Sequence, residues 1–229
     1  MDRGSFEISG GYIGILRDKK GRLKAIRSNK NVIVDKGLDI IASLLGNINS
    51  PSYAKAIAMG TNAIGGTADS GTTTTTVDAE RTETGTDYWK GAYIEFTSGP
   101  NIGVRKKITA FNPATDTITH EAFDNAVAAG HTYFLTPRPV DTALQNEVLR
   151  KLSTNSLDQS ANFPNGLDSK LRLSVTFGET EANGALTQSA IFDASENGNM
   201  ISGDSFAVVN KGSSDVLTWI WEYTIKRGQ

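Results

Sequence analysis

The stretch that decides the fold is LRLSVTFGETEANGALTQSAIFDASENGNMISGDSFAVVNKGSSDVLTWIWEYTI, residues 171–225. From Leu171 to Phe177 apolar and polar side chains alternate, and this period of two predicts a strand with one buried face. The pair Asn183-Gly184 indicates a tight turn, and strand-like runs follow at Ala185–Phe192 and Ser205–Val209. Together with the final run, these segments predict four strands of one antiparallel sheet.

The final run, from Leu217 to Ile225, is the most apolar of the four. Trp219, Trp221 and Tyr223 share one face of the expected strand, and polar side chains occupy the other face. Because aromatic side chains bury large areas, this face is predicted to form the centre of a core. Stacking of the same rings on a sugar is the alternative interpretation.

Residues 171–225 also resemble the C-terminal half of a group of small virion proteins of tailed bacteriophages. The shared features are a Glu-Ala-Asn-Gly turn (181–184), a strand of small residues that ends at Phe192, an Asn-Met turn (199–200) and a final Thr-Trp strand. The motif NVIVDKGLDIIASLLGN (31–47) is similar to the N-terminal pattern of the same group. This resemblance implies a structural protein of the virion.

The N-terminal part predicts a hairpin followed by a helix. Strands are expected at Tyr12–Leu16 and Leu23–Arg27. A helix is predicted between Asp35, a typical N-cap, and Gly46, a typical stop. The basic residues around the hairpin form either a solvated surface or a patch that faces an acidic neighbour; they are Arg17, Lys19, Lys20, Arg22, Lys24, Arg27 and Lys30.

An insertion is indicated between residues 62 and 140. In the smaller members of the phage group, a Gly-Thr strand end runs directly into an Asp-Thr-Ala-Leu-x-x-Glu-x-x-Arg segment. The matching pieces here are Gly60-Thr61 and Asp141–Arg150, which are far apart in the chain. Thr142 and Gln145 fit a capping box and predict a helix over 141–152, with a polar loop at 162–166 further on.

The insertion is expected to contain a linker and a small β-module. Residues 66–77 include five consecutive threonines and predict an exposed linker. The segment YWKGAYIEFTSGPNIGVRKKITAFNPATDTITHEAFDNAVAAGHTYFL (88–135) resembles a β-module repeated in many phage tail and fibre proteins. The predicted fold is therefore mainly β: a discontinuous antiparallel β-sandwich (1–65 and 138–229) with one short helix, a linker (66–77) and an inserted β-module (78–137).

The sequence predicts no catalytic, cofactor-binding or metal-binding residues. His120 and His131 would need Glu121 or Asp124 to hold a metal, and polar positions at strand edges are the simpler interpretation. No nucleophile elbow or phosphate-binding motif is present. The acidic groups fall in predicted turns, and a calcium loop built from them lacks the usual spacing; these residues are Glu179, Glu181, Asp193, Glu196, Asn197, Asn199 and Asp204.

Composition and resemblance together define the expected class of protein. The 229 residues carry a formal net charge of −2, no cysteine and no long apolar run, which argues against nucleic-acid binding, thiolate sites and a membrane span. We expect a non-enzymatic virion component of the tail tip, baseplate, collar or fibre-attachment type, assembled in the host bacterial cytoplasm with other virion proteins and without a cofactor. Uncharged strand edges, such as Ala185–Phe192, predict a homo-oligomer. A capsid decoration protein and a host-receptor or carbohydrate-binding module are the alternatives.

Overall fold

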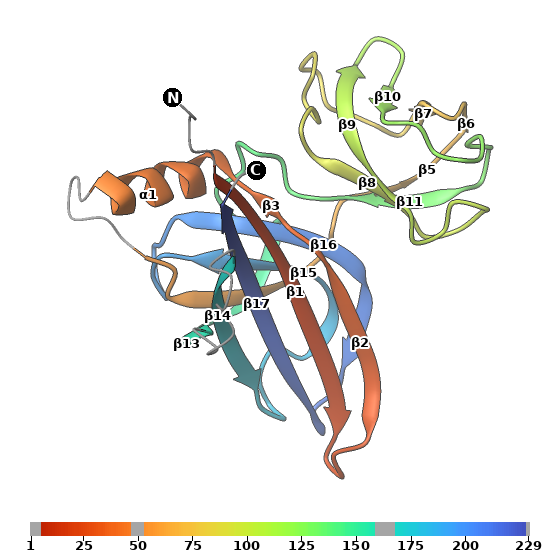
Figure 1. Cartoon of the computed structure of the whole chain (residues 1–229). Helices are drawn as coiled ribbons and strands as arrows, with labels where there is room; N and C mark the ends of the chain where they lie inside the picture. Colours follow the sequence, from red (N-terminus) through yellow and green to blue (C-terminus); the bar gives the residue numbers. More distant parts are fainter. Residues whose placement is uncertain (1–5, 47–52, 159–167, 228–229) are drawn as a thin grey trace.

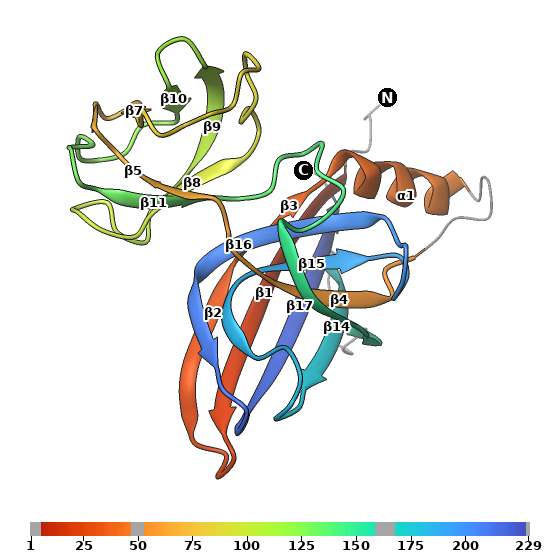
Figure 2. The same cartoon turned by 180° about the vertical axis from the view of Figure 1, so that it is seen from behind.

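The computed structural model describes residues 6–46, 53–158 and 168–227, and these form a mainly β structure, as predicted (Figure 1). The strands form three antiparallel sheets, and α1 (Asp35–Gly46) is the one helix of the described ranges. Two sheets pack face to face as a sandwich, while the third stands at one end of it (Figures 1 and 2). The loop predicted at 162–166 lies outside the described residues.

The sandwich has a front sheet and a back sheet, whose strands cross steeply in both views (Figures 1 and 2). The front sheet consists, in spatial order, of β13 (Thr154–Asp158), β14 (Asp168–Phe177), β17 (Asp215–Arg227), β1 (Phe6–Asp18) and β2 (Leu23–Lys30). The back sheet consists of β12 (Asn146–Leu152), β4 (Ala56–Thr61), β15 (Gly184–Phe192), β16 (Met200–Lys211) and β3 (Val32–Ile33).

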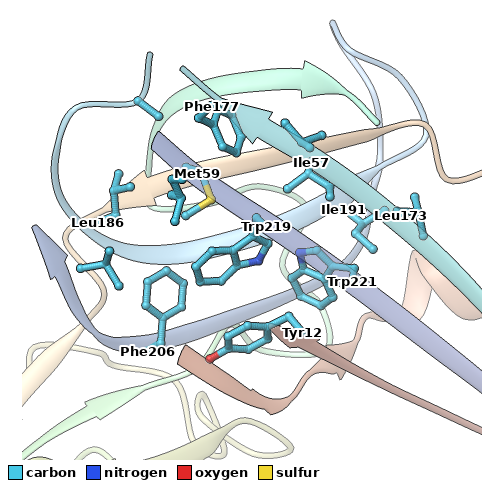
Figure 3. Packing of buried hydrophobic residues seen from close by; sticks show 14 of the residues in the cluster. Tyr12, Ile57, Met59, Leu173, Phe177, Leu186, Ile191, Phe206, Trp219 and Trp221 are labelled. Carbon is cyan, nitrogen blue, oxygen red and sulfur yellow. The ribbon is translucent and has the colours of Figure 1, made fainter. Parts of the chain in front are cut away.

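The core of the sandwich forms around β17. Trp219 and Trp221 are fully buried between the sheets, which confirms the prediction for this face. Tyr12 of β1 stacks on Trp219 with the ring centroids 5.0 Å apart, and Phe206 of β16 lies 4.7 Å from the same indole (Figure 3). The residue opposite Trp219 is Gly14, and a Cβ there would overlap the indole, so glycine is needed for this close packing.

The four C-terminal runs do not form the single sheet predicted from the sequence. β14 and β17 pair in the front sheet, whereas β15 and β16 pair in the back sheet. The apolar face of β17 needs a second layer to bury against, and the turn between β14 and β15 carries the chain across to that layer. β15 lies between β4 and β16, and residues 188–192 pair on both sides, so most of the run Ala185–Phe192 has no open edge and does not support the prediction of an oligomer.

The two predicted helices have different outcomes. α1 begins at Asp35 and ends at Gly46, as predicted, and Gly37 lets it approach β16, since a Cβ there would overlap the carbonyl oxygen of Ile201. The helix predicted over 141–152 is wrong, because residues 146–152 form β12 and pair with β4. Pairing with the otherwise open edge of β4 outweighs the local capping pattern.

The third sheet forms the module. Its strands are, in spatial order, β5 (Gly65–Thr67), β11 (Thr132–Leu135), β8 (Tyr93–Phe96), β9 (Arg105–Asn112), β10 (Thr117–His120), β7 (Thr75–Val77) and β6 (Ser70–Gly71). The linker predicted over 66–77 is wrong, because this stretch supplies β6, β7 and part of β5. Thr76 is fully buried, and the Thr72 hydroxyl accepts the backbone N–H groups of Thr74 and Thr75, so these threonines build strands and a turn.

Candidate functional site

The sandwich and the module meet at a junction that the chain crosses twice. Thr61 in β4 lies directly opposite Asn146 in β12, so the two connections to the module begin and end on neighbouring strands. The large buried residues form separate clusters, with Trp89, Phe96 and Phe111 in the module and the Trp219 cluster in the sandwich. Contacts at the junction therefore determine how the two parts are held together.

Arg105 in β9 is the side chain that joins the module to the sandwich. Its Nη1 donates to both carboxylate oxygens of Asp204 in β16, at 2.8 and 2.9 Å, and its Nε donates to Glu95 Oε2 in β8 at 2.9 Å. Nη1 and Nη2 also donate to the carbonyl oxygens of Lys30 and Ser205, each at 2.9 Å. Glu95, Arg105 and Asp204 are called the junction cluster below.

Burial controls the electrostatics of the junction cluster. Asp204 is fully buried, and the side chain of Arg105 is only 10% exposed. Loss of solvation raises the pKa of Asp204 to about 7, although the Arg105 guanidinium opposes this shift. Burial alone would lower the pKa of Arg105, but the carboxylates of Asp204 and Glu95 keep that pKa raised. Removing either partner would leave a buried charge without compensation.

Two further contacts support the junction. Asn29 of β2 donates through Nδ2 to Glu95 Oε2 at 3.0 Å, which ties the front sheet to β8. Arg138, in the connection that returns from the module, lies over the Tyr88 ring at 3.9 Å and pairs with Asp141 at 2.7 Å. These contacts and the junction cluster hold the module in a defined orientation on the sandwich.

A cleft of about 700 Å³ opens beside the junction cluster and is lined by both parts. Lys30 and Lys107 line it, and neither forms an ion pair with another described residue. Its lining offers apolar contacts and positive charge, which suit binding of another molecule. The lining also includes Arg105, the acidic Asp35 and the apolar side chains of Ile8, Val32, Ile33, Leu38, Tyr93 and Pro139.

The two histidines have structural contacts within the module. His120 is buried, with Nε2 3.0 Å from Thr76 Oγ1 and Nδ1 3.0 Å from the carbonyl oxygen of Glu121. Burial lowers the pKa of His120. His131 Nδ1 accepts the backbone N–H of Ala128 at 3.2 Å. Within the described ranges, no three His, Cys, Asp or Glu side chains are placed to hold a metal, so His120, His131, Glu121 and Asp124 do not form such a set.

The acidic turn residues are separated by their own contacts. Glu181 pairs with Lys151 at 2.7 Å, and this hydrogen bond lowers the pKa of Glu181. Asp193 accepts the backbone N–H of Asn199 at 2.6 Å and its side-chain amide at 2.9 Å. These interactions stabilise turns. Three further residues of the set are simply exposed: Glu179, Glu196 and Asn197.

Two interpretations from the sequence change once the side chains are placed. Trp219, Trp221 and Tyr223 are buried, so stacking of these rings on a sugar is wrong. Asp204, which the sequence groups with the calcium candidates, instead binds Arg105, and the role of Arg105 was missed. A signal was present, because an acidic residue within the apolar run around β16 needs a buried partner.

Comparison with protein-family models, with curated proteins and with solved structures found no match. In the part of the chain that the structure describes, no helix combines the length and apolar character that a bilayer crossing requires. Function is therefore inferred from the residues, from their contacts and from the resemblance of the sequence motifs.

Proposed function

We propose that this chain is a non-enzymatic structural component of a tailed-phage virion, of the tail tip, baseplate, collar or fibre-attachment type, which acts through protein–protein assembly. The motif resemblance supports the proposal on both sides of the insertion, in residues 31–61 and 171–225. Both of these segments belong to the sandwich, and the inserted segment has its own resemblance to a module of phage tail and fibre proteins.

The observation that carries the proposal furthest is the junction cluster. Arg105 connects the module to Asp204 and to two backbone carbonyl groups of the sandwich. A protein of two parts binds its neighbours more tightly when the orientation of one part relative to the other is already fixed. Less conformational freedom is then lost on association. The junction cluster provides such a fixed orientation between a sandwich and a module that both expose surface to neighbours.

Immunogold electron microscopy of phage particles, with an antibody raised against the purified chain, tests the proposal. We expect label at one end of the tail or at the collar. Label distributed over the head would favour the capsid decoration alternative. Intact particles without label, and without the chain by mass spectrometry, would contradict a role in the virion.

A further inference from the structure

The outer face of the front sheet exposes a group of large aliphatic side chains. Ile13 is 46% exposed, Leu23 54% and Ile26 50%, although each lies in the β1–β2 hairpin. Ile15 stands opposite Ile26 across the hairpin, and Ile13 stands opposite Ile220 of β17. These five residues are called the aliphatic face. A contiguous exposed apolar surface of this kind is typical of a contact site.

A hollow of about 550 Å³ adjoins the aliphatic face. Gly10, Gly11, Ile13, Ser28 and Ile220 are among the residues that line it, and the two glycines have no side chain to fill the space. Arg172 and Glu222, which form an ion pair at 2.9 Å, also line it, together with Lys30. The module stands at one end of the sandwich and leaves this face of the front sheet uncovered (Figure 1). The hollow therefore suits an apolar side chain of another molecule.

The charges of the two parts are complementary. Residues 17–30 of the hairpin contain seven basic residues and one acidic residue. The module, residues 65–137, contains nine acidic residues and five basic ones. Two hairpins brought face to face would repel each other, whereas a hairpin and a module would attract. The charge distribution thus favours a contact between different surfaces of two copies over a symmetric contact.

The module also has an exposed apolar tip. In the turn between β8 and β9, Ile102 is 64% exposed and Val104 is 38% exposed. Asn101 in this turn donates through Nδ2 to the carbonyl oxygen of Asn125 at 2.8 Å, which fixes the turn beside the loop that contains Asp124. The module tip, defined as residues 101–104 with Asp124, therefore combines an apolar knob with an acidic neighbour.

We propose that the module tip of one copy docks on the aliphatic face of a second copy, with Ile102 in the hollow beside Ile13. The contact is head-to-tail, so a pair of copies keeps one free tip and one free face, and further copies can add until a ring closes or a filament forms. This inference specifies a partner for the assembly role and rests on the proposed function. The association predicted from the sequence relied on an open edge at Ala185–Phe192, but β15 lies inside the back sheet, so the present contact uses other surfaces.

Analytical ultracentrifugation of the full chain tests the contact with two disruptive variants and one control. Ile13→Lys damages the face, and Ile102→Lys damages the tip and opposes its acidic charge. We expect self-association of the wild type that weakens with added salt, and at least about tenfold weaker association for each variant. Leu152→Lys, at a residue of β12 that is 62% exposed, should associate like the wild type.

Mixing the two disruptive variants gives the sharper result. The intact tip of Ile13→Lys should bind the intact face of Ile102→Lys, so an equal mixture forms a one-to-one dimer and nothing larger. A monomeric wild type, a mixture that stays monomeric, or equal loss in Leu152→Lys would overturn the inference. A misfolded variant would be seen by circular dichroism, and Ile13→Thr and Ile102→Thr then take their places.

Absence of self-association in a chain that is present in particles refutes only this contact. Association of a chain that is absent from particles refutes only the virion role.

Discussion

The sandwich and the module are both antiparallel β-structures, but they differ in the length of their strands and in the size of their cores. The sandwich packs large rings on long strands, and β1 and β17 each have 13 residues. The module has strands of two to eight residues and buries polar groups within its core, including Asp78, which accepts the Tyr133 hydroxyl at 2.5 Å. The sandwich buries polar groups as well, and Trp221 Nε1 donates to the buried Ser189 hydroxyl at 3.1 Å. Both parts therefore pair their buried polar groups, and the sandwich differs in its longer strands and larger cluster of rings.

The largest expected effect comes from the aromatic core of the sandwich. Trp219→Ala or Trp221→Ala removes a fully buried ring, which costs about 3–5 kcal/mol and is comparable to the stability of a whole domain. We expect each variant to lose cooperative folding of the sandwich in thermal melts followed by circular dichroism. Glu179→Ala, at an exposed turn, is the control and should melt like the wild type. Unchanged midpoints in both tryptophan variants would contradict the core described here.

The next effect comes from the junction cluster. Arg105→Met leaves Asp204 buried without its partner, and we expect a loss of about 3 kcal/mol in the free energy of unfolding. The double variant Arg105→Met/Asp204→Leu replaces both charges and should recover most of the loss. Urea titrations of the single and double variants measure this coupling. If the losses in free energy of unfolding of Arg105→Met and Asp204→Leu sum to the loss of the double variant, the two side chains contribute independently.

The two parts should also differ in their response to pH. Burial lowers the pKa of His120, so the folded module favours the neutral ring; its stability is full above about pH 6.5 and falls as the pH drops below that value. The pKa of Asp204 is raised to about 7, so the folded junction favours the protonated acid, and its contribution to stability grows as the pH falls from about 7 toward about 4.

Hydrogen exchange at about pH 7.5 and pH 5.5, corrected for intrinsic rates, can resolve these opposite trends. We expect the amides of β10 to open more readily at the lower pH, by up to about tenfold per pH unit, while those of β16 near Asp204 do not. His120→Gln should remove the acid sensitivity of β10, and Asp204→Asn should leave that sensitivity in place. If the amides of β10 and β16 change their opening free energy equally between the two pH values, His120 and Asp204 do not control the pH response.

The smallest effect is expected on the outer face of the front sheet. Glu222 pairs with Lys170 at 3.1 Å and with Arg172 at 2.9 Å, and all three side chains are at least 30% exposed. Exposed ion pairs contribute little, so Glu222→Gln should change the free energy of unfolding by less than about 1 kcal/mol in chemical denaturation. A loss as large as that of Arg105→Met would mean that burial does not explain why the junction cluster matters.

Parts of this fold could be predicted because the information is local. The alternation over 171–177 and 217–223 fixes which side chains face inward, and Asp35 and Gly46 mark the ends of α1. The assignment of strands to sheets could not be predicted in the same way. β15 and β17 both bury apolar side chains, and only their pairing with β4 and β1, which are distant in sequence, places them in different sheets.

The errors have the same physical origin. A capping pattern at 142–145 favours a helix locally, but pairing with β4 makes the following residues a strand. The threonines at 72–76 look too polar to pack, yet Thr76 is buried because its hydroxyl meets His120. Arg105 and Asp204 are separated by almost half of the chain, so their pairing at the junction depends on the complete fold.

The most direct test of separate cores is a thermal unfolding measurement. It uses a chain in which a short Gly-Ser bridge replaces residues 64–136. Thr61 and Asn146 are paired, so the new loop is easily closed, and Asp204 becomes open to water when the module is absent. The only tryptophans left are Trp219 and Trp221, which report on the sandwich alone. We predict a single cooperative transition and tryptophan fluorescence that stays shielded from acrylamide. Loss of the cooperative transition, with exposed tryptophans, would show that the sandwich and the module share one core.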